Sequence, residues 1–463
     1  MLIGQLGNYG IKSPFADEGV GIVAGGEYRV ETIANTPDAV FINGDLASTS
    51  PQLPIQGTYS VYEFFGEAHV PLVADKPFLH RLSLDLSDRY ARYSLQGVAN
   101  AYKVGADWSP IADFRLRANL SRAIRAPNGH ELFLANTLAK FTGQDPCAGA
   151  APTASAAQCA NTGVKPGQYG NIPDTGNFNY LTGGNLKLRP ETADTITLGG
   201  VITPTFLRGF NFSVDYWRIS VKTYVGSYSA KSTLDNCINN DTFCNLVQRD
   251  AGGSLSLGNG LTAGRVIATN LNTGSFAQSG IDFAGTYGFG LDTLGLHSAG
   301  RLSLNFVGSL ALNTRIQPIP GDVVFDCVGF YGPICTGEGP TSPIPRWRNQ
   351  LRVTWSAPKI VQLSLNWRHI SGLNAEATSS STHLQGAVFP IDARIAPYDY
   401  LDLAASFDIT EKYSLRVGVN NIADRRSPLV GTNANPQILG GNQVASIYDT
   451  LGRYAFVGLT LKL

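Results

Sequence analysis

A regular alternation of apolar and polar residues, repeated in many short segments, constrains this chain more than any other feature. Every second residue is apolar in 361–368 (VQLSLNWR), and the same holds in much of 401–409 (LDLAASFDI) and 413–420 (YSLRVGVN). A period of two places successive side chains on opposite faces of a strand, so these segments predict β-strands with one apolar and one polar face. Several approach the roughly 9–11 residues that a tilted strand needs to cross a bilayer.

The same pattern along the whole chain predicts about fourteen strands and no helical domain. The predicted fold class is therefore all-β. The predicted ranges are 18–33, 59–73, 78–91, 97–109, 113–125, 190–203, 208–222, 275–290, 298–313, 345–356, 359–371, 398–409, 412–422 and 449–463.

The predicted connections alternate between short and long, with 92–96 as the one short exception on the long side. Tight turns at one rim and long loops at the other are typical of an antiparallel transmembrane β-barrel, whose turns are periplasmic and whose loops are extracellular. A large soluble β-sandwich or propeller is the alternative, although no propeller-like repeat of about 40–50 residues is visible. The short connections are 74–76, 110–112, 204–207, 291–297, 357–358 and 410–411, and the long ones are 126–189, 223–274, 314–344, 372–397 and 423–448.

The composition agrees with a two-faced membrane protein. Only 15% of the residues are charged, against about 25% in ordinary soluble domains. Lys+Arg and Asp+Glu both total 35, so no net charge favours nucleic acid as a partner. No stretch of about 18 apolar residues occurs, which excludes a transmembrane helix.

Six cysteines form three local pairs, and each pair lies in one predicted long loop. Six cysteines allow fifteen connectivities, but separate loops favour the local one. Disulfides persist in oxidising compartments, so this pairing supports export. Metal binding is the rival interpretation, although no histidine lies close to a pair. The pairs are Cys147 with Cys159, Cys237 with Cys244, and Cys327 with Cys335.

The first residues lack the features of a secretory signal. Residues 1–8 (MLIGQLGN) contain neither a basic region nor an apolar core of the required length. Because the other features indicate export, we expect the natural protein to begin further upstream.

Several segments, taken in order, resemble the TonB-dependent receptor family, and the resemblance covers the chain from about residue 18 onward. The segment 121–128 (SRAIRAPN), which leads to 131–133 (ELF), is the most specific match. The other segments are 25–29 (GGEYR), 61–67 (VYEFFGE) with 70–72 (VPL), 185–187 (NLK) with 189–192 (RPET), 211–221 (NFSVDYWRISV), 280–282 (GID), 418–424 (GVNNIAD) and the closing 448–463.

The resemblance implies the plugged, 22-stranded class of outer-membrane barrel. The strands of this chain would be the last fourteen, so residues 1–463 would form one partial barrel domain without the plug and the first strands. The segment that binds TonB in this family precedes the plug and would also be missing. The chain departs from outer-membrane barrels that end in an aromatic residue, because its last residue is Leu463.

The function implied is TonB-dependent active transport across the bacterial outer membrane. This chain would supply the barrel wall and extracellular loops, in contact with outer-membrane lipid, and TonB would act on the missing N-terminal part. The nutrient would be a small molecule such as a siderophore, cobalamin or an oligosaccharide. A passive porin or an adhesin-type barrel is the alternative, and it would need no plug.

Charged residues on the polar faces are the candidates for contact with the lumen or the plug. The alternative is that they line a wet cavity or pair across neighbouring strands. Ligand-binding residues cannot be assigned, because the Asn- and Gly-rich loops 167–181 and 433–448 also fit ordinary turn chemistry. The lumen candidates are Glu63, Glu67, Arg115, Arg117 and Arg125.

An enzyme is the hypothesis from another class, and the sequence does not support it. No G-x-S-x-G elbow, H-E-x-x-H zinc motif or P-loop occurs. Lone histidines such as His80, His130 and His369 are typical of strand or loop positions rather than of ligands. We therefore predict no catalytic residue, no metal site and no cofactor.

Overall fold

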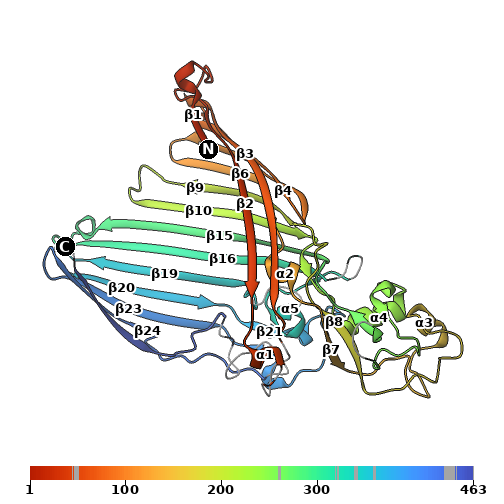
Figure 1. Ribbon diagram of the computed structural model, residues 1–463. Coiled ribbons are helices and arrows are strands. Elements are labelled where there is room, and N and C mark those ends of the chain that lie inside the picture. Colours follow the sequence, from red (N-terminus) through yellow and green to blue (C-terminus); the bar gives the residue numbers. More distant parts are fainter. Residues whose placement is uncertain are drawn as a thin grey trace.

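A computed structural model describes residues 1–43, 45, 52–258, 262–318, 320, 323–337, 342–357, 361–431, 444 and 446–461. It is dominated by one curved antiparallel sheet of 16 strands (Figure 1). The strands follow one another across the sheet in sequence order, with the loop strands left out. The all-β prediction is therefore confirmed.

Each of the predicted strand ranges overlaps one strand of this sheet. Two short strands, β1 (Leu2–Gln5) and β17 (Phe325–Asp326), were not predicted; β1 lies at the edge and β17 pairs with β16. The others are β2 (Gly21–Asn35), β3 (Ile55–Lys76), β4 (Leu79–Tyr93), β5 (Gly97–Ile111), β6 (Phe114–Arg125), β9 (Glu191–Ile202), β10 (Phe210–Lys222), β15 (Ser275–Gly290), β16 (Arg301–Gln317), β19 (Trp347–Ser356), β20 (Val361–Ile370), β23 (Tyr398–Asp408), β24 (Tyr413–Asn420) and β25 (Tyr454–Leu461).

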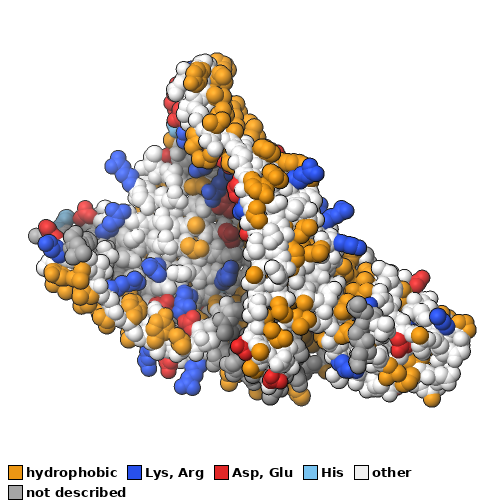
Figure 2. Space-filling view, in the orientation of Figure 1, with side chains coloured by type: hydrophobic (Ala, Val, Ile, Leu, Met, Phe, Trp, Pro, Cys, Tyr) orange, Lys and Arg blue, Asp and Glu red, His pale blue; other side chains and the backbone are white. Residues whose placement is uncertain are grey.

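The strand register sorts the side chains into two faces. Asn366 of β20 lies opposite Asp402 of β23, whereas its neighbour Leu365 lies opposite Leu403. We call the face of Asn366 the polar face and the face of Leu365 the apolar face. Leu365 remains 43% exposed, so no second protein layer covers the apolar face there. Figure 2 looks into the hollow that the curved sheet surrounds, and charged side chains border it.

Aromatic side chains line parts of the apolar face. The rings of Tyr28 and Tyr62 lie 4.5 Å apart. At the rim of short turns, the indole of Trp108 donates to the carbonyl oxygen of Phe78 at 3.0 Å, and that of Trp355 donates to Ala299 at 2.7 Å. Indole and phenol rings at the ends of an apolar band are typical of membrane interfaces.

The sheet is open rather than closed. Among the described residues, β25 pairs only with β24, and β1 pairs only with β2. The expectation of a barrel therefore holds for the curved, two-faced sheet and not for its closure within this chain.

The long loops contain most of the remaining elements, which the strand pattern did not predict. No helix among the described residues is long and apolar enough to cross a membrane. The loop strands are β7 (Thr137–Thr142), β8 (Asn177–Thr182), β11 (Val225–Gly226), β12 (Val247–Gln248), β13 (Arg265–Ile267), β14 (Leu271–Asn272), β18 (Phe330–Tyr331), β21 (Leu373–Ala375) and β22 (Arg394–Ile395). The helices are α1 (Ala39–Asn43), α2 (Gly129–Phe133), α3 (Ala156–Asn161), α4 (Ala230–Asn240) and α5 (Pro333–Gly337), with 3-10 turns η1 (Leu6–Tyr9), η2 (Cys244–Leu246), η4 (Leu291–Leu294), η5 (Glu376–Thr378) and η6 (Pro390–Asp392).

Candidate functional site

The five charged candidates lie on one face of the sheet. Glu67 of β3 is opposite Ser87, Ser87 is opposite Lys103, and Lys103 is opposite Ser121 of β6. Cross-strand partners share a face, and so do residues two apart within a strand. Glu63 and Glu67 therefore share the polar face with all three arginines of β6, which are Arg115, Arg117 and Arg125.

Arg125 is the last residue of β6, and its side chain binds residues of β9 and α2. Its guanidinium donates to both carboxylate oxygens of Glu191, at 2.6 Å each, and to those of Glu131 at 2.9 and 3.0 Å. Glu131 also accepts from the backbone N–H of Asn128 and completes the cap of α2. This network fixes the point where the chain leaves the sheet and enters the first long loop.

The other arginines of β6 pair with carboxylates on the same face. Arg117 binds both oxygens of Asp215 at 2.7 and 2.6 Å, across the width of β9, which has Gly199 at that position. Asp107 of β5 accepts from Arg115. The polar face of these strands is thus held by ion pairs within the sheet itself.

The two glutamates differ in their surroundings. Glu63 is only 3% exposed and lies 3.8 Å from Arg29 and 3.5 Å from Arg89. Glu67 makes no ion pair with another described residue, and it borders a hollow together with the His69–Asp85 pair. Four of the five predicted candidates therefore have ionic partners on nearby strands or in α2.

A second ionic network on the polar face was missed by the sequence analysis. Arg368 of β20 binds both oxygens of Asp402, at 2.9 and 3.0 Å, and both oxygens of Asp449, at 3.0 and 2.6 Å. The alternation placed Arg368 and Asp402 at polar strand positions. Nothing in the sequence indicates that Asp449, which precedes β25, reaches them.

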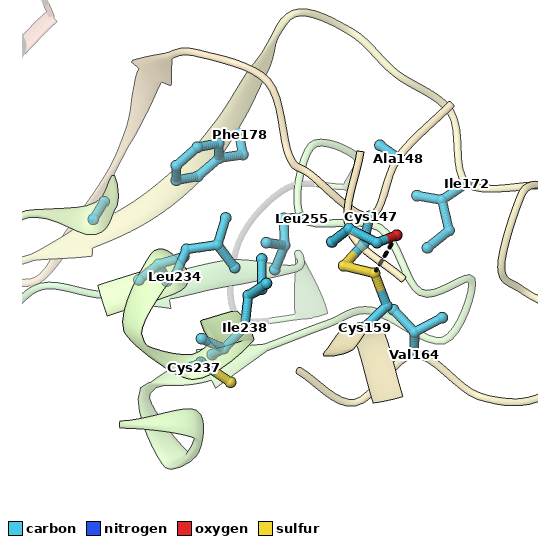
Figure 3. Close-up of a cluster of buried hydrophobic side chains, with 14 residues drawn as sticks. Cys147, Ala148, Cys159, Val164, Ile172, Phe178, Leu234, Cys237, Ile238 and Leu255 are labelled. Carbon is cyan, nitrogen blue, oxygen red and sulfur yellow. Dashed lines mark hydrogen bonds between the residues drawn. A yellow bond between two sulfur atoms is a disulfide. The ribbon is translucent and has the colours of Figure 1, made fainter. Parts of the chain in front are cut away.

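Two long loops fold together into one module, which consists of the described residues of 137–182 and 225–272. Strands β12, β13, β8 and β7 form its sheet, and α3 and α4 pack beside it. Its core includes Phe178, Leu234 and Leu255 (Figure 3). We call this unit the loop module; Figure 1 shows it projecting from the end of the large sheet.

The predicted disulfides are confirmed, and two of them lie in the loop module. They join Cys147 to Cys159 and Cys237 to Cys244, and the third joins Cys327 to Cys335. The described residues contain no free cysteine. They also contain no group of three or more His, Cys, Asp or Glu that could hold a metal ion.

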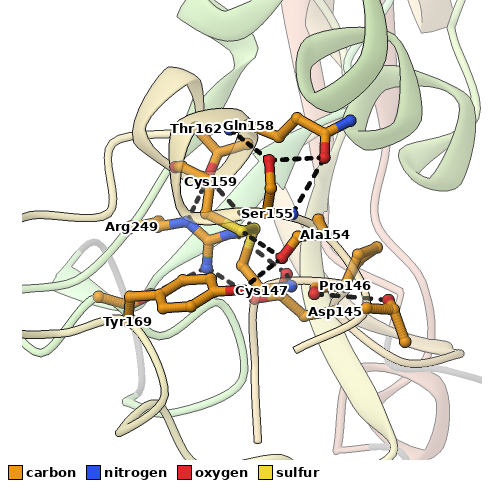
Figure 4. The surroundings of a disulfide bond; sticks show 12 residues. Asp145, Pro146, Cys147, Ala154, Ser155, Gln158, Cys159, Thr162, Tyr169 and Arg249 are labelled. Atoms are coloured by element: carbon orange, nitrogen blue, oxygen red, sulfur yellow. Dashed lines mark hydrogen bonds and ion pairs between the residues drawn. A yellow bond between two sulfur atoms is a disulfide. The ribbon is translucent and has the colours of Figure 1, made fainter. Parts of the chain in front are cut away.

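A buried ion pair accompanies the first disulfide (Figure 4). The Arg249 guanidinium donates to both oxygens of Asp145, at 2.6 and 3.1 Å, and to the Thr162 hydroxyl at 2.8 Å. The two charged side chains are only 2% and 1% exposed. They join the two loops, because Asp145 belongs to the first and Arg249 to the second.

The loops near the third disulfide form separate apolar clusters. The Glu376 side chain lies among them and accepts hydrogen bonds from the backbone N–H groups of Ile334 at 2.9 Å and Cys335 at 2.7 Å. Burial raises the pKa of the Glu376 carboxyl above its usual value, although these bonds oppose the shift. Burial likewise raises the pKa of Tyr331 to about 12.

The two Asn- and Gly-rich loops and the three histidines named from the sequence do not come together at one site. Residues 167–181 are part of the loop module, whereas most of 433–448 lies outside the described residues. His80 contacts Asp75 at 3.1 Å, His369 contacts Asp399 at 2.8 Å, and His130 lies in α2.

One protein family has a sequence profile that matches most of the chain. The sequence profile of the family described as TonB dependent receptor-like, beta-barrel matches residues 5–422. No curated protein matches the chain significantly.

Solved structures of similar fold include two receptors and a copper transporter. A mutant of the ferric enterobactin receptor PfeA from Pseudomonas aeruginosa, in complex with enterobactin, has a TM-score of 0.61 at 17% identity, over 96% of this chain and 51% of that one. The siderophore receptor PirA from Acinetobacter baumannii has a TM-score of 0.57 at 13% identity, over 96% and 52%. The copper transporter OprC has 0.51 at 12%, over 96% and 54%. The chain thus spans about half the length of the structures that it matches.

Proposed function

The chain belongs to the TonB-dependent receptor-like β-barrel family, and from this premise we propose that it forms part of an outer-membrane receptor for active nutrient uptake. Its strands would supply a stretch of the barrel wall, and its stapled loops would face the outside. The nutrient would be a scarce small molecule such as a siderophore, cobalamin or an oligosaccharide. Members of this family are receptors and transporters rather than enzymes, which supports a role without catalysis.

The proposal rests on two differences within the sheet, one between its two rims and one between its two faces. Apart from the connection 6–20, short turns join the strands at one rim, whereas the other rim carries the long loops, three of which contain a disulfide. The apolar face is left uncovered, as contact with lipid requires. The polar face carries the ionic networks, as a surface that surrounds an aqueous or protein-filled lumen requires.

TonB is the proposed energy source, acting on a plug in the whole protein. The five charged residues Glu63, Glu67, Arg115, Arg117 and Arg125 would face this plug. The four that are paired would stiffen the wall by their pairing, and Glu67 would be free to contact the plug directly.

Growth of three strains tests the proposal: wild type, a deletion of this gene, and a deletion of the TonB gene. Each is supplied with one limiting nutrient at a time, chosen from ferric siderophores, cobalamin and oligosaccharides. We expect one nutrient whose use is lost in both deletions. A passive porin predicts instead a nutrient whose use depends on this gene but not on TonB, and that result would contradict the proposal.

A further inference from the structure

The apolar face of the sheet ends at the same level on neighbouring strands. The register carries the face of Leu365 through β19, β16 and β15 to β10, and from β10 through β9 to β6. From the turn rim outward, β6 presents on this face Phe114, Leu116, Ala118, Leu120 and then Arg122. In the same direction, β10 presents Phe210, Phe212, Val214, Tyr216 and then Arg218. The step from Phe114 to Arg122 is about 26 Å along the strand, which is on the scale of the roughly 25 Å apolar band of outer-membrane barrels.

Four cations occupy the outer end of this face on β4, β6 and β10. We call them the basic sector, which consists of Arg92, Arg122, Arg218 and Lys222. Two acidic residues, Asp88 and Asp194, lie at the same level, and on β16 the exposed Arg315 has Asp326 as its cross-strand neighbour. On β19, β20, β23 and β24, all of whose residues are described, this face carries no Lys or Arg. The excess of positive charge is therefore confined to one side of the wall.

Arg122 is the fixed point of the basic sector. Its guanidinium donates to both carboxylate oxygens of Asp194 at 2.7 and 3.1 Å, and it lies 5.4 Å from the centroid of the Tyr102 ring. The Nζ atom of Lys222 lies 3.3 Å from the same carboxylate, and the Lys222 side chain stays 60% exposed. One carboxylate thus serves two cations and leaves Lys222 accessible from outside.

The other two cations of the basic sector are exposed beside apolar side chains. Within the described part of the chain, neither Arg92 nor Arg218 makes an ion pair. Arg218 lies opposite Ile196, and Ile196 lies opposite Leu120. Ile196 and Leu120 remain 49% and 46% exposed. A ligand that suits both the free guanidinium and the uncovered apolar surface is anionic at one end and apolar at the other, as a charged lipid is.

We propose that the basic sector binds the phosphate groups of a phosphorylated lipid in the outer leaflet, whose acyl chains lie against Leu120 and Ile196. Arg218 and Lys222 donate to the phosphate oxygens, because a guanidinium matches phosphate through parallel N–H groups and an ammonium binds it as a point charge. Cations at a membrane surface attract anionic headgroups in the same way. The site rests on the outward orientation of the loop rim in the proposed function, and it does not depend on transport.

The place of the basic sector in the fold links lipid to the loops. Strand β6 leads through Arg125 into the first loop of the loop module, and β10 leads into the second. The loop module projects from this end of the sheet (Figure 1). A lipid phosphate bound by Arg218 and Lys222 is therefore held at the base of the loop module.

Fluorescence titration of the full-length protein, purified in detergent, with diphosphoryl lipid A tests the site. One control is the same lipid without its phosphates, which keeps the acyl chains, and the other is inorganic phosphate, which keeps the anion. We expect the phosphorylated lipid to bind at least about fivefold more tightly than the dephosphorylated one, and inorganic phosphate not to compete. Equal binding of the two lipids, or competition by inorganic phosphate as strong as by the lipid, would overturn the proposal.

Substitutions in the basic sector have effects of opposite sign. Arg218→Gln and Lys222→Gln should each weaken binding of the phosphorylated lipid about fivefold, because each removes one cation at the membrane surface. Asp194→Asn should strengthen binding, since it removes the carboxylate that occupies Arg122 and Lys222. A variant that failed to fold could not show this gain.

Arg208→Gln is the matched control, because Arg208 is exposed in the short turn before β10, at the opposite rim. An equal loss of lipid binding in Arg208→Gln, or weaker binding in Asp194→Asn, would overturn the site.

The outcomes distinguish this site from the proposed function. Phosphate-dependent lipid binding without TonB-dependent growth leaves the site and removes the transport proposal. TonB-dependent growth without phosphate-dependent lipid binding does the reverse.

Discussion

At the scale of single residues, the structure pairs buried charges that lie far apart in the sequence. Asp145 and Arg249 are the most completely buried example, and each belongs to a different loop. A buried pair contributes little net stability compared with an apolar replacement, but removal of one partner leaves a charge without compensation. Such a pair therefore makes the two loops depend on each other.

Arg249→Ala should unfold the loop module locally. We expect its free energy of local unfolding to fall by about 3–5 kcal/mol, because Asp145 would remain buried and unpaired. Hydrogen exchange of the amides in 145–164 measures this change. Lys231→Ala is the control: the Lys231–Asp235 pair lies on the exposed side of α4 in the same module, so its loss should change stability by less than about 1 kcal/mol. Equal effects of the two substitutions would contradict the prediction.

Glu376 should make the stability of its loop depend on pH. Its pKa is raised in the folded loop, so the folded loop holds the proton more tightly than the unfolded chain. This stabilising contribution is complete below the ordinary glutamate pKa and is lost as the pH rises through the folded value. Hydrogen exchange of 330–337, corrected for intrinsic rates, should show protection that decreases from acidic to neutral pH. Glu376→Gln should flatten this dependence; an unchanged slope would refute the assignment.

At the scale of the elements, the alternation along each strand sets which side chains share the apolar face. Leu363, Leu365 and Trp367 share the apolar face of β20, and Ser364 and Asn366 share the polar one. The pattern of the sequence was sufficient here, because the period of a strand is a property of its backbone.

Leu365→Arg should hinder insertion, whereas Ser364→Arg should not. An arginine on the lipid side near the middle of the bilayer costs about 2–4 kcal/mol, and an arginine on the polar face can remain hydrated. The stability of the full-length protein folded into lipid vesicles, measured by urea titration, checks the difference. Equal destabilisation by the two neighbouring substitutions would show that the faces are wrongly assigned.

At the scale of the whole molecule, the open sheet requires further strands or another cover. Unpaired backbone groups in lipid cost several kcal/mol each, and both edges of this sheet are unpaired among the described residues. The chain also spans about half of the structures that it resembles. Both findings support the proposal that the working barrel contains more than these strands.

The native product should therefore be larger than this chain. We expect an antibody against the loop module to detect, in purified outer membranes, a band near twice the mass of this chain that shifts on heating. This chain expressed alone should not transport. A heat-shifting band near the mass of the chain itself would instead favour a smaller barrel without a plug.

The sequence by itself determined the strands, their faces, the family and the pairing of the cysteines. These properties depend on neighbours along the chain: alternation defines a strand, and two cysteines within one loop are close whatever the rest of the fold does. The polar residues on the strands, including Arg117 and Arg368, could also be placed on the correct face. Their ionic partners could not be assigned, because these come from other strands and loops.

Only the tertiary structure decided what lies beside what. It brought Asp449 to Arg368, and it joined two loops into one module through Arg249. These contacts depend on strand register and loop packing, which are set by the whole chain rather than by any local pattern. The physical reason is one of range: local periodicity fixes the direction of a side chain, and only the assembled sheet fixes its partner.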